Sequence, residues 1–343
     1  MNYLIHTHRF IPQIQYLSLS PLQMIYSESD PGENQTISDV FILVGFSNLN
    51  KLQILLFLVL LVTYLVALMG NLLVILFIKL NPSLHTPMYF FLVNLSFLDI
   101  CYTSSVVPQL LVHLLVEQKT INIAGCAAQM YIIIIMGLME CCLQAAMAYD
   151  RYVAICHPLH YRTIMSGWAC AQLAGASWTI DISVEVAQTT WIFSLPFCGS
   201  SRIHHFFCNI PQVVKMARMD TSKNKIMVLS VLVLFIMGPF LLITLLSYMC
   251  IISTILKLQS EGGRHKSFST YSSHLMVVTL FFGMALFAYL RPKSISTPES
   301  DQMISLVITV AAPVLNPTIY NLRNKEVKGA FRKTVKKSIF SHN

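Results

Sequence analysis

Charged side chains are scarce in this chain. Of its 343 residues only 11% are Asp, Glu, Lys or Arg, whereas 55% are hydrophobic and the mean hydropathy is +0.64. A soluble domain carries about 25% charged residues. These few charged residues could not provide enough polar surface to cover a globule of this size. The composition therefore predicts a membrane protein. The net charge of +8 does not indicate nucleic-acid binding, because the basic residues cluster at the ends of apolar runs and in the C-terminal segment.

Several other patterns are missing. The nine cysteines include no CxxC pair and no Cys/His metal spacing, which argues against a zinc site. No nucleophile–base pair or metal-ligand set suggests an enzyme, and neither paired repeats nor a continuous polar pore suggests a transporter. The N-terminus lacks a basic stretch followed by an apolar one, so we expect no cleavable signal peptide. Linkers and low-complexity tracts are also absent, so we expect one domain.

What the sequence does contain is seven long apolar runs. They predict an all-α membrane protein, a seven-transmembrane helix bundle over residues 54–321. Residues 1–53 would precede the bundle, and 322–343 would form a tail whose basic segment Leu322 to Lys337 predicts a short amphipathic helix on membrane lipid. The predicted spans are Ile54–Ile78, Tyr89–Leu111, Gln129–Ile155, Cys170–Phe193, Ile226–Leu256, His274–Leu290 and Met303–Asn321.

The third run ends in the stretch MAYDRYVAICHPLHY, Met147 to Tyr161. A straight helix from Cys126 to Arg151 is roughly 38 Å long, about the hydrocarbon core plus part of both interfaces. These two residues therefore belong on opposite sides of a bilayer. Short loops on the Arg151 side carry more basic residues, so that side is expected to be cytoplasmic and the N-terminus extracellular.

This orientation makes the sequon at Asn34 available for glycosylation. A second sequon at Asn94 lies inside an apolar run, where the transferase cannot reach it, so we interpret it as chance.

Five blocks of sequence together resemble the olfactory receptors, a family of class A, rhodopsin-like G protein-coupled receptors. They occur in the family's order and cover the chain from about Phe41 to Lys333. Beyond MAYDRYVAICHPLHY, the blocks are HTPMYFFLVNLSFLDI from His85, SYMCII from Ser247, HKSFSTYSSHL from His265 and PVLNPTIYNLRNKEV from Pro313. Most relatives begin near the sequon, so residues 1–30 are an atypical extension and Met24 lies near the usual start.

The resemblance implies a function. Small, mostly apolar volatile ligands would bind, helices six and seven would rearrange, and a heterotrimeric G protein of the stimulatory olfactory type would raise cyclic AMP. The implied location is the plasma membrane, in cilia of olfactory sensory neurons. Two alternatives remain open: a receptor for an endogenous metabolite outside the olfactory epithelium, and a poorly functional receptor relic. The implied switch residues are Asp150, Arg151, Tyr152, Tyr248, Asn316, Pro317 and Tyr320.

The resemblance also implies a disulfide between Cys126 and Cys208. The family has two further loop cysteines that bond to each other. Here Cys198 matches the first, but Arg218 stands where the second is expected. Cys198 is therefore predicted to be a free thiol.

Two acidic residues, Asp99 and Glu140, are predicted to lie near the middle of the membrane, about 21 Å and 16 Å along their helices from the cytoplasmic ends. Two buried carboxylates repel each other unless they are protonated or bridged by a cation. They could flank a sodium ion or share a proton, with Asn71 and Asn316 nearby. The alternative is two protonated, hydrogen-bonded acids without an ion. No other cofactor is expected.

The ligand pocket implied by the resemblance is largely aliphatic, with Tyr289 and Thr309 as polar groups. Such a pocket would bind its ligand by buried apolar area and one hydrogen bond. Phe282 stands where the family usually has Tyr. The residues are Ile133, Ile134, Gly137, Leu138, Val233, Ile236, Phe282, Ala285, Leu286, Tyr289, Leu306 and Thr309.

Asp181 and Glu185, four residues apart in the fourth run, depart from the family, which is apolar or small there. They could share a proton, line a wet vestibule, or attract a protonated amine. The interpretation favoured by the sequence alone is that both reach interfacial water near the extracellular end of the helix.

Overall fold

The computed structural model describes residues 40–46, 52–116, 118–195, 202–216, 238–257 and 297–323, together with 275–281, 283–284 and 287. Within these ranges the molecule is almost entirely helical. The long helices are α2 (Gln53–Leu80), α3 (Pro87–Leu115), α4 (Ile123–Cys156), α6 (Gly167–Phe193), α9 (Gly238–Lys257) and α11 (Pro298–Arg323). Shorter elements are β1 (Val40–Leu43), η2 (Pro82–Leu84), β2 (Thr120–Asn122), η3 (Pro158–His160), α5 (Tyr161–Ile164), β3 (Arg202–Ile203) and α7 (Ile210–Lys215).

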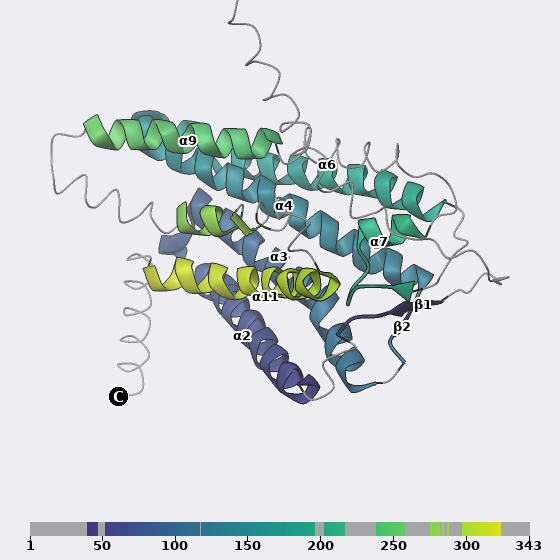
Figure 1. Ribbon diagram of the computed structural model, residues 1–343. Coiled ribbons are helices and arrows are strands. Elements are labelled where there is room, and N and C mark those ends of the chain that lie inside the picture. The colour runs from purple at the N-terminus through teal and green to yellow at the C-terminus, as the bar shows by residue number, and fades with distance from the viewer. Residues whose placement is uncertain are drawn as a thin grey trace, which may run out of the picture.

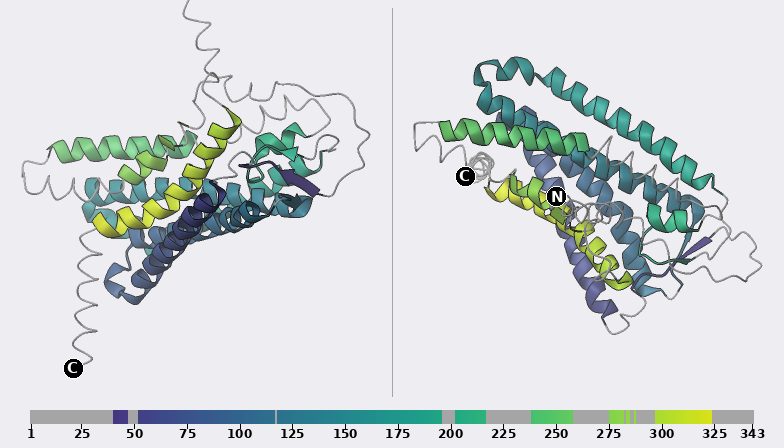
Figure 2. Two further views of the ribbon diagram at one scale, coloured as in Figure 1. Left: turned by 60° about the horizontal axis from the view of Figure 1, so that its bottom comes forward. Right: turned by 45° about the horizontal axis from the view of Figure 1, so that its top comes forward.

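Helix α4 lies at the centre of the bundle and packs against α3, α6 and α9. Helices α2 and α11 contact α3 and each other on the side away from α6 and α9, as Figures 1 and 2 show. The three short strands and α7 gather at one end of the bundle (Figure 1). We call this the disulfide end, because it contains Cys126 and Cys208, and we call the opposite end the Arg151 end.

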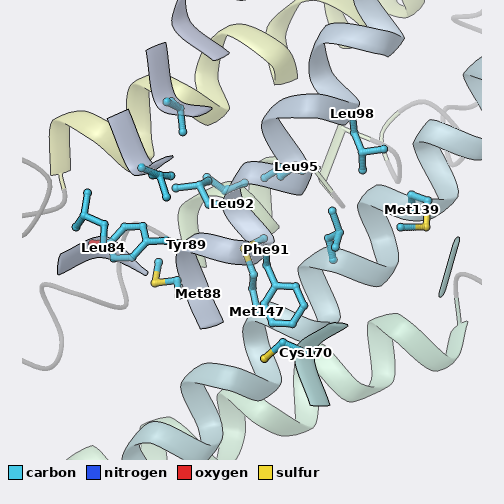
Figure 3. Packing of buried hydrophobic residues seen from close by; sticks show 14 of the residues in the cluster. Leu84, Met88, Tyr89, Phe91, Leu92, Leu95, Leu98, Met139, Met147 and Cys170 are labelled. Carbon is cyan, nitrogen blue, oxygen red and sulfur yellow. The ribbon is translucent and has the colours of Figure 1, made fainter. Parts of the chain in front are cut away.

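The central core forms where α2, α3, α4 and α6 meet. Phe91, Met139 and Met147 are completely buried there, and Cys170 of α6 closes the cluster from the far side (Figure 3). By contrast, much of α2 is apolar on its exposed side as well, with Leu65, Leu72 and Leu76 about half exposed. A helix that is apolar on every side suits a membrane, where lipid covers the outer face.

Five helical segments in the described part of the chain are long and apolar enough to cross a membrane. They are Gln53–Leu80, Pro87–Leu115, Ile123–Cys156, Phe240–Lys257 and Glu299–Ile319. Helix α6 has sufficient length but is less apolar, because Asp181, Glu185 and several hydroxyl residues interrupt it. It nevertheless packs within the bundle against α4.

A small sheet covers the disulfide end, in the order β2-β1-β3. Strand β1 pairs antiparallel with β2, with Phe41 opposite Ile121, and parallel with β3, with Leu43 opposite Ile203. Phe41 and Leu43 face inward and are buried, whereas Val40 and Ile42 are exposed. The sequence analysis predicted no structure in residues 1–53, so this strand was missed.

The predicted spans agree with α2, α3, α6 and α11 to within about five residues. Helix α4 begins six residues before the predicted Gln129, because Asn122 caps it: its Oδ1 accepts a hydrogen bond from the Gly125 N–H at 2.6 Å. The fifth predicted span is described from Gly238 onward, and the sixth only in part. Asn34, Cys198, Arg218 and the predicted tail helix after Arg323 lie outside the described residues.

Candidate functional site

The disulfide end contains the expected bond between Cys126 and Cys208, whose Cα atoms are 5.5 Å apart. Gln129, one helical turn below Cys126, extends this connection through its side-chain amide. Its Oε1 accepts from the Cys208 N–H at 3.0 Å, and its Nε2 donates to Gln109 Oε1 at 2.7 Å and to the Ser105 carbonyl at 3.0 Å. Gln129 thus joins α3, α4 and the loop, a role that the sequence analysis did not assign to it.

Helix α11 is tied to the same end by Gln302, which is buried. Its Oε1 accepts from the Phe46 N–H at 3.1 Å, and its Nε2 donates to the Val44 and His204 carbonyls at 3.4 and 3.3 Å. One amide therefore joins the N-terminal segment, the loop that contains β3 and the last long helix. These three segments form a lid over the disulfide end.

His205 lies in this lid, two residues after β3, and is buried. Its ring stacks on Phe206 with centroids 4.6 Å apart and meets Phe207 edge-on at 4.4 Å. Burial lowers the pKa of His205 to about 4, because the apolar surroundings disfavour the charged imidazolium. The lid is therefore assembled around a neutral histidine.

The structure places six of the predicted pocket residues, all on α4 and α11. Ile133 packs in the cluster that contains Leu306, and Ile134 packs toward the disulfide-end cluster. Thr309 is buried, donates to the Ser305 carbonyl and lies 3.4 Å from the Tyr102 hydroxyl. Leu138 is buried, whereas a Cβ placed on Gly137 would meet no atom of the described residues within 4 Å. The other predicted pocket residues, Val233, Ile236, Phe282, Ala285, Leu286 and Tyr289, lie outside the described residues.

Halfway along the bundle, the structure brings Asp99, Glu140 and Asn316 together from α3, α4 and α11. The Asn316 Nδ2 donates to both Asp99 carboxylate oxygens at 3.3 and 3.2 Å and to Glu140 Oε1 at 3.4 Å. One amide thus bridges two acids that are far apart in the sequence. This arrangement reduces the repulsion between the carboxylates and fixes the distance between three helices.

Asn71 was predicted to belong to the same group, but its side-chain hydrogen bonds go elsewhere. Its Nδ2 donates to the Pro313 carbonyl at 2.9 Å and to the Ala67 carbonyl at 3.0 Å. Because Pro317 has no N–H, the Pro313 carbonyl has lost its normal partner four residues along α11. Asn71 supplies the missing donor from α2, so its position is explained by the proline rather than by the carboxylates.

At the Arg151 end, Asp150 is completely buried and accepts hydrogen bonds from two sides. Arg151 donates to Asp150 Oδ2 through Nε at 3.0 Å and Nη2 at 2.6 Å, and the Tyr161 hydroxyl donates to Oδ1 at 2.7 Å. Burial and the neighbouring Asp150 charge raise the pKa of Tyr161, so this phenol remains a neutral donor. Sequence analysis quoted Tyr161 within the motif but gave it no role.

The remaining predicted switch residues lie on α4, α9 and α11. The Tyr152 hydroxyl lies 3.1 Å from His157 Nε2, and Tyr152 also packs against the cluster that contains Tyr248, Ala148 and Ile251. Pro317 approaches α2 so closely that a Cβ added to Gly70 would lie 3.3 Å from its ring. The backbone of Tyr320 is helical, and its side chain lies outside the described residues.

The interpretation that Asp181 and Glu185 reach interfacial water is wrong. They are 2% and 0% exposed, on the face of α6 that packs against α4. Asp181 Oδ2 accepts from Cys142 Sγ at 3.3 Å, and Glu185 accepts from the Thr189 hydroxyl. A sequence signal for this burial existed: helical spacing puts both acids on the same stripe of α6 as its other buried residues. The stripe consists of Cys170, Ala174, Asp181, Glu185, Thr189 and Ile192.

Comparison with known proteins gives one consistent result. A family model described as olfactory receptor matches residues 60–338. Human olfactory receptor 10A4 is 52% identical over 310 residues, covering 90% of this chain and 98% of that receptor, and human olfactory receptor 10A7 is 48% identical over 307 residues, covering 90% and 97%. The dog protein named olfactory receptor-like protein OLF3 is 47% identical over 300 residues, covering 88% of this chain and 94% of that protein.

Among solved structures, squid rhodopsin superposes with a TM-score of 0.64 at 18% identity and covers 92% of both chains. At this identity the similarity concerns the fold, which is that of a seven-helix receptor.

Proposed function

This chain belongs to the olfactory receptor family, and from that premise we propose that it binds small, mostly apolar odorants and activates a heterotrimeric G protein of the stimulatory olfactory type. Members of the family are multi-pass membrane receptors rather than enzymes. In our proposal the disulfide end, with Asn34 and the rest of residues 1–53, faces outward. The Arg151 end and the tail from residue 322 face the cytoplasm. Disulfides form in oxidising compartments, which supports this orientation. The expected location is the plasma membrane of olfactory cilia.

The observation that carries the proposal is the pairing of Arg151 with Asp150 at the cytoplasmic end of α4. The guanidinium is 15% exposed, whereas the carboxylate is completely buried. A buried carboxylate neutralises Arg151 and restrains it within the bundle. When ligand binding moves the neighbouring helices, Arg151 would leave Asp150 and contact the G protein.

The proposed odorant site lies between α4, α11 and the segments that carry the remaining predicted pocket residues. Support comes from Gly137, where an added Cβ would meet no described atom, and from the aliphatic side chains of Leu138, Ile133 and Leu306, the last two of which pack in one cluster. A pocket of this kind binds through apolar area, and Thr309 adds one polar group. The lid tied down by Gln302 would cover its ligand.

The group of Asp99, Glu140 and Asn316 is proposed to respond to sodium or to share a proton. Its chemistry fits a sodium ion, because two carboxylates offer several hard oxygen ligands close together. In that case Asp99 and Glu140 would bind the ion, which would neutralise their charge and stabilise the resting arrangement. An agonist dose–response curve that does not change with sodium concentration, either in the natural protein or in Asp99→Asn, would exclude the ion.

A cyclic AMP reporter screen with an odorant panel tests the proposed function. At least one odorant should raise cyclic AMP in cells that carry the receptor, and the rise should disappear in Arg151→Ala at equal surface expression. Replacing the stimulatory subunit with an inhibitory one should abolish the response. A receptor that is present at the surface but silent toward the whole panel would contradict the proposal.

A further inference from the structure

Two acids lie inside the interface between α4 and α6, and they require an explanation. Placing a carboxylate among apolar helices is costly unless the group has a partner. Within the described ranges, neither Asp181 nor Glu185 lies within 4.0 Å of a Lys, Arg or His nitrogen. The two acids differ in the hydrogen bonds that they accept.

Asp181 is engaged between the helices, because its Oδ2 accepts a hydrogen bond from Cys142 of α4. Glu185 is bonded only within its own helix: Oε1 accepts from Thr189, and Oε2 is buried without a hydrogen-bond partner among the described residues. A buried oxygen of this kind loses its hydration without compensation. The structure therefore contains a half-satisfied, fully buried carboxylate at Glu185.

Thr189 connects this carboxylate to a cavity. The threonine lies one helical turn from Glu185 and lines a cavity of about 610 Å³ that is widely open at the surface between α4 and α6, near the disulfide end. The lining combines aromatic rings, hydroxyl groups and small apolar side chains. It consists of Ala127, Ala128, Tyr131, Ile132, Thr189, Thr190, Phe193 and Ser194.

This cavity is separate from the proposed odorant pocket. Ile132 lines the cavity and is 38% exposed, whereas the next residue, Ile133, packs toward Leu306 of α11. Consecutive residues on a helix point about 100° apart, so α4 presents one face to each site. The two sites therefore use different sides of the same helix.

We propose that the cavity between α4 and α6 binds a small protonated amine with an apolar body. The Thr189 hydroxyl already donates to Glu185, so its oxygen is available to accept an N–H from the ligand ammonium. The negative charge of Glu185 then attracts the ligand ammonium from the far side of the Thr189 hydroxyl. The buried Glu185 side chain does not have to move. Tyr131 and Phe193 supply rings beside which a cation is stabilised, and Ala127, Ala128 and Ile132 contact the apolar body. The inference goes beyond the proposed function, because it concerns a second site with its own ligand class, and binding at this site does not require G protein coupling.

The test compares 2-phenylethylamine with its neutral analogue 2-phenylethanol on the purified full-length receptor in lipid nanodiscs. Binding is measured by the ligand-induced rise in thermal midpoint and by equilibrium titration. The amine should bind more tightly than the alcohol. Its dissociation constant should rise about tenfold or more in Glu185→Gln, because the ammonium loses the attraction of the buried Glu185 charge. Thr189→Val should weaken the amine in the same way.

Asp181→Asn is the matched control, since it neutralises the other buried acid on the same face of α6 and should leave amine affinity within about twofold. Equal amine binding by the natural protein and Glu185→Gln, no preference for amine over alcohol, or an equal loss in Asp181→Asn would overturn the proposal. If Glu185→Gln does not fold, Thr189→Val decides by the same criteria. An amine that binds without raising cyclic AMP would leave this site intact, and failure of the proposed function would show separately, as silence toward the whole odorant panel.

Discussion

At each of three levels of the bundle, one side chain provides a hydrogen-bond partner. Without it, a neighbouring charged group or a backbone carbonyl would be left unpaired. Asp150 is the acceptor for both Arg151 and Tyr161, Asn316 bridges Asp99 and Glu140, and Asn71 donates to the carbonyl freed by Pro317. Each of these groups joins different helices or a helix and a loop. Removing one donor leaves a buried acceptor unsatisfied, so small substitutions should have measurable effects.

Tyr161→Phe should raise the basal activity of the receptor. The phenol hydroxyl donates to Asp150 at 2.7 Å, so its loss weakens the group that restrains Arg151. A hydrogen bond of about 1 kcal/mol at this half-buried site corresponds to roughly a fivefold shift in the resting equilibrium. Ligand-independent cyclic AMP, normalised to surface expression, measures the change.

Tyr149→Phe is the control, because Tyr149 is 37% exposed and makes only a ring contact with Tyr152 among the contacts of the described residues. Equal basal signals in both variants would refute the restraint.

Asn71→Leu should lower the thermal stability of the folded receptor. The substitution leaves the Pro313 carbonyl buried without its donor, which costs about 1–3 kcal/mol. The thermal midpoint of the purified receptor reports this loss. Asn94→Leu provides the comparison, since the Asn94 amide donates only to the Phe90 carbonyl of its own helix at an exposed position. A midpoint for Asn71→Leu as high as that of Asn94→Leu would show that the Pro313 carbonyl needs no donor from α2.

At the level of elements, the lid is built from short pieces that stabilise one another. Strand β1 has four residues and β3 has two, which is too short to be stable alone. They are stabilised by pairing across the sheet, by Gln302 from α11 and by the buried rings of His205, Phe206 and Phe207. Among the described residues of the lid, His205 is the buried histidine, so its charge state should affect how stably the lid is ordered.

Acidification should loosen the lid. Burial lowers the pKa of His205 in the folded protein to about 4, below the roughly 6.5 of an unfolded histidine. The unfolded state therefore binds the proton first. The stability that neutral His205 provides is complete above about pH 6.5 and is lost as the pH falls toward about 4.

The thermal midpoint of the natural receptor should accordingly fall by several degrees over this pH interval. In His205→Gln the fall should be smaller, while the exposed neighbour variant His204→Gln should behave like the natural protein. The same pH dependence in His205→Gln would show that other groups cause the loss.

The long elements were predictable from the sequence and the short ones were not. Apolar runs mark α2, α3, α4, α6 and α11, because lipid requires about twenty apolar residues regardless of tertiary contacts. Strand β1 carries no such signal, since its partners are two loops far away in the chain. The predicted exposure of Asp181 and Glu185 to water was also wrong, because hydropathy alone assigns acids to water. Asp99 and Glu140 were placed at a common depth by counting helical rise, but the bridging by Asn316 depends on α11 and required the structure.

At the level of the whole molecule, α4 connects all the candidate sites. Its 34 residues extend over about 50 Å. It carries Cys126 and Gln129 at the disulfide end, Glu140 in the middle, and Asp150 and Arg151 at the opposite end. Helix α9 packs against α4, and helix α11 packs against α3, which itself contacts α4. A ligand that alters this packing near Gly137 can therefore change the environment of Arg151 through continuous contacts.

The central claim is that ligand binding near Gly137, about halfway along α4, releases Arg151 to a G protein at the Arg151 end. Odorant-dependent nucleotide exchange on the purified stimulatory G protein, with receptor reconstituted in nanodiscs, measures this coupling directly. The natural receptor and Arg162→Ala, which alters an exposed cation of the neighbouring α5, should accelerate exchange when odorant is added. Arg151→Ala should bind the same odorant with similar affinity and fail to accelerate exchange. Undiminished exchange in Arg151→Ala, or an equal loss in both variants, would contradict the account.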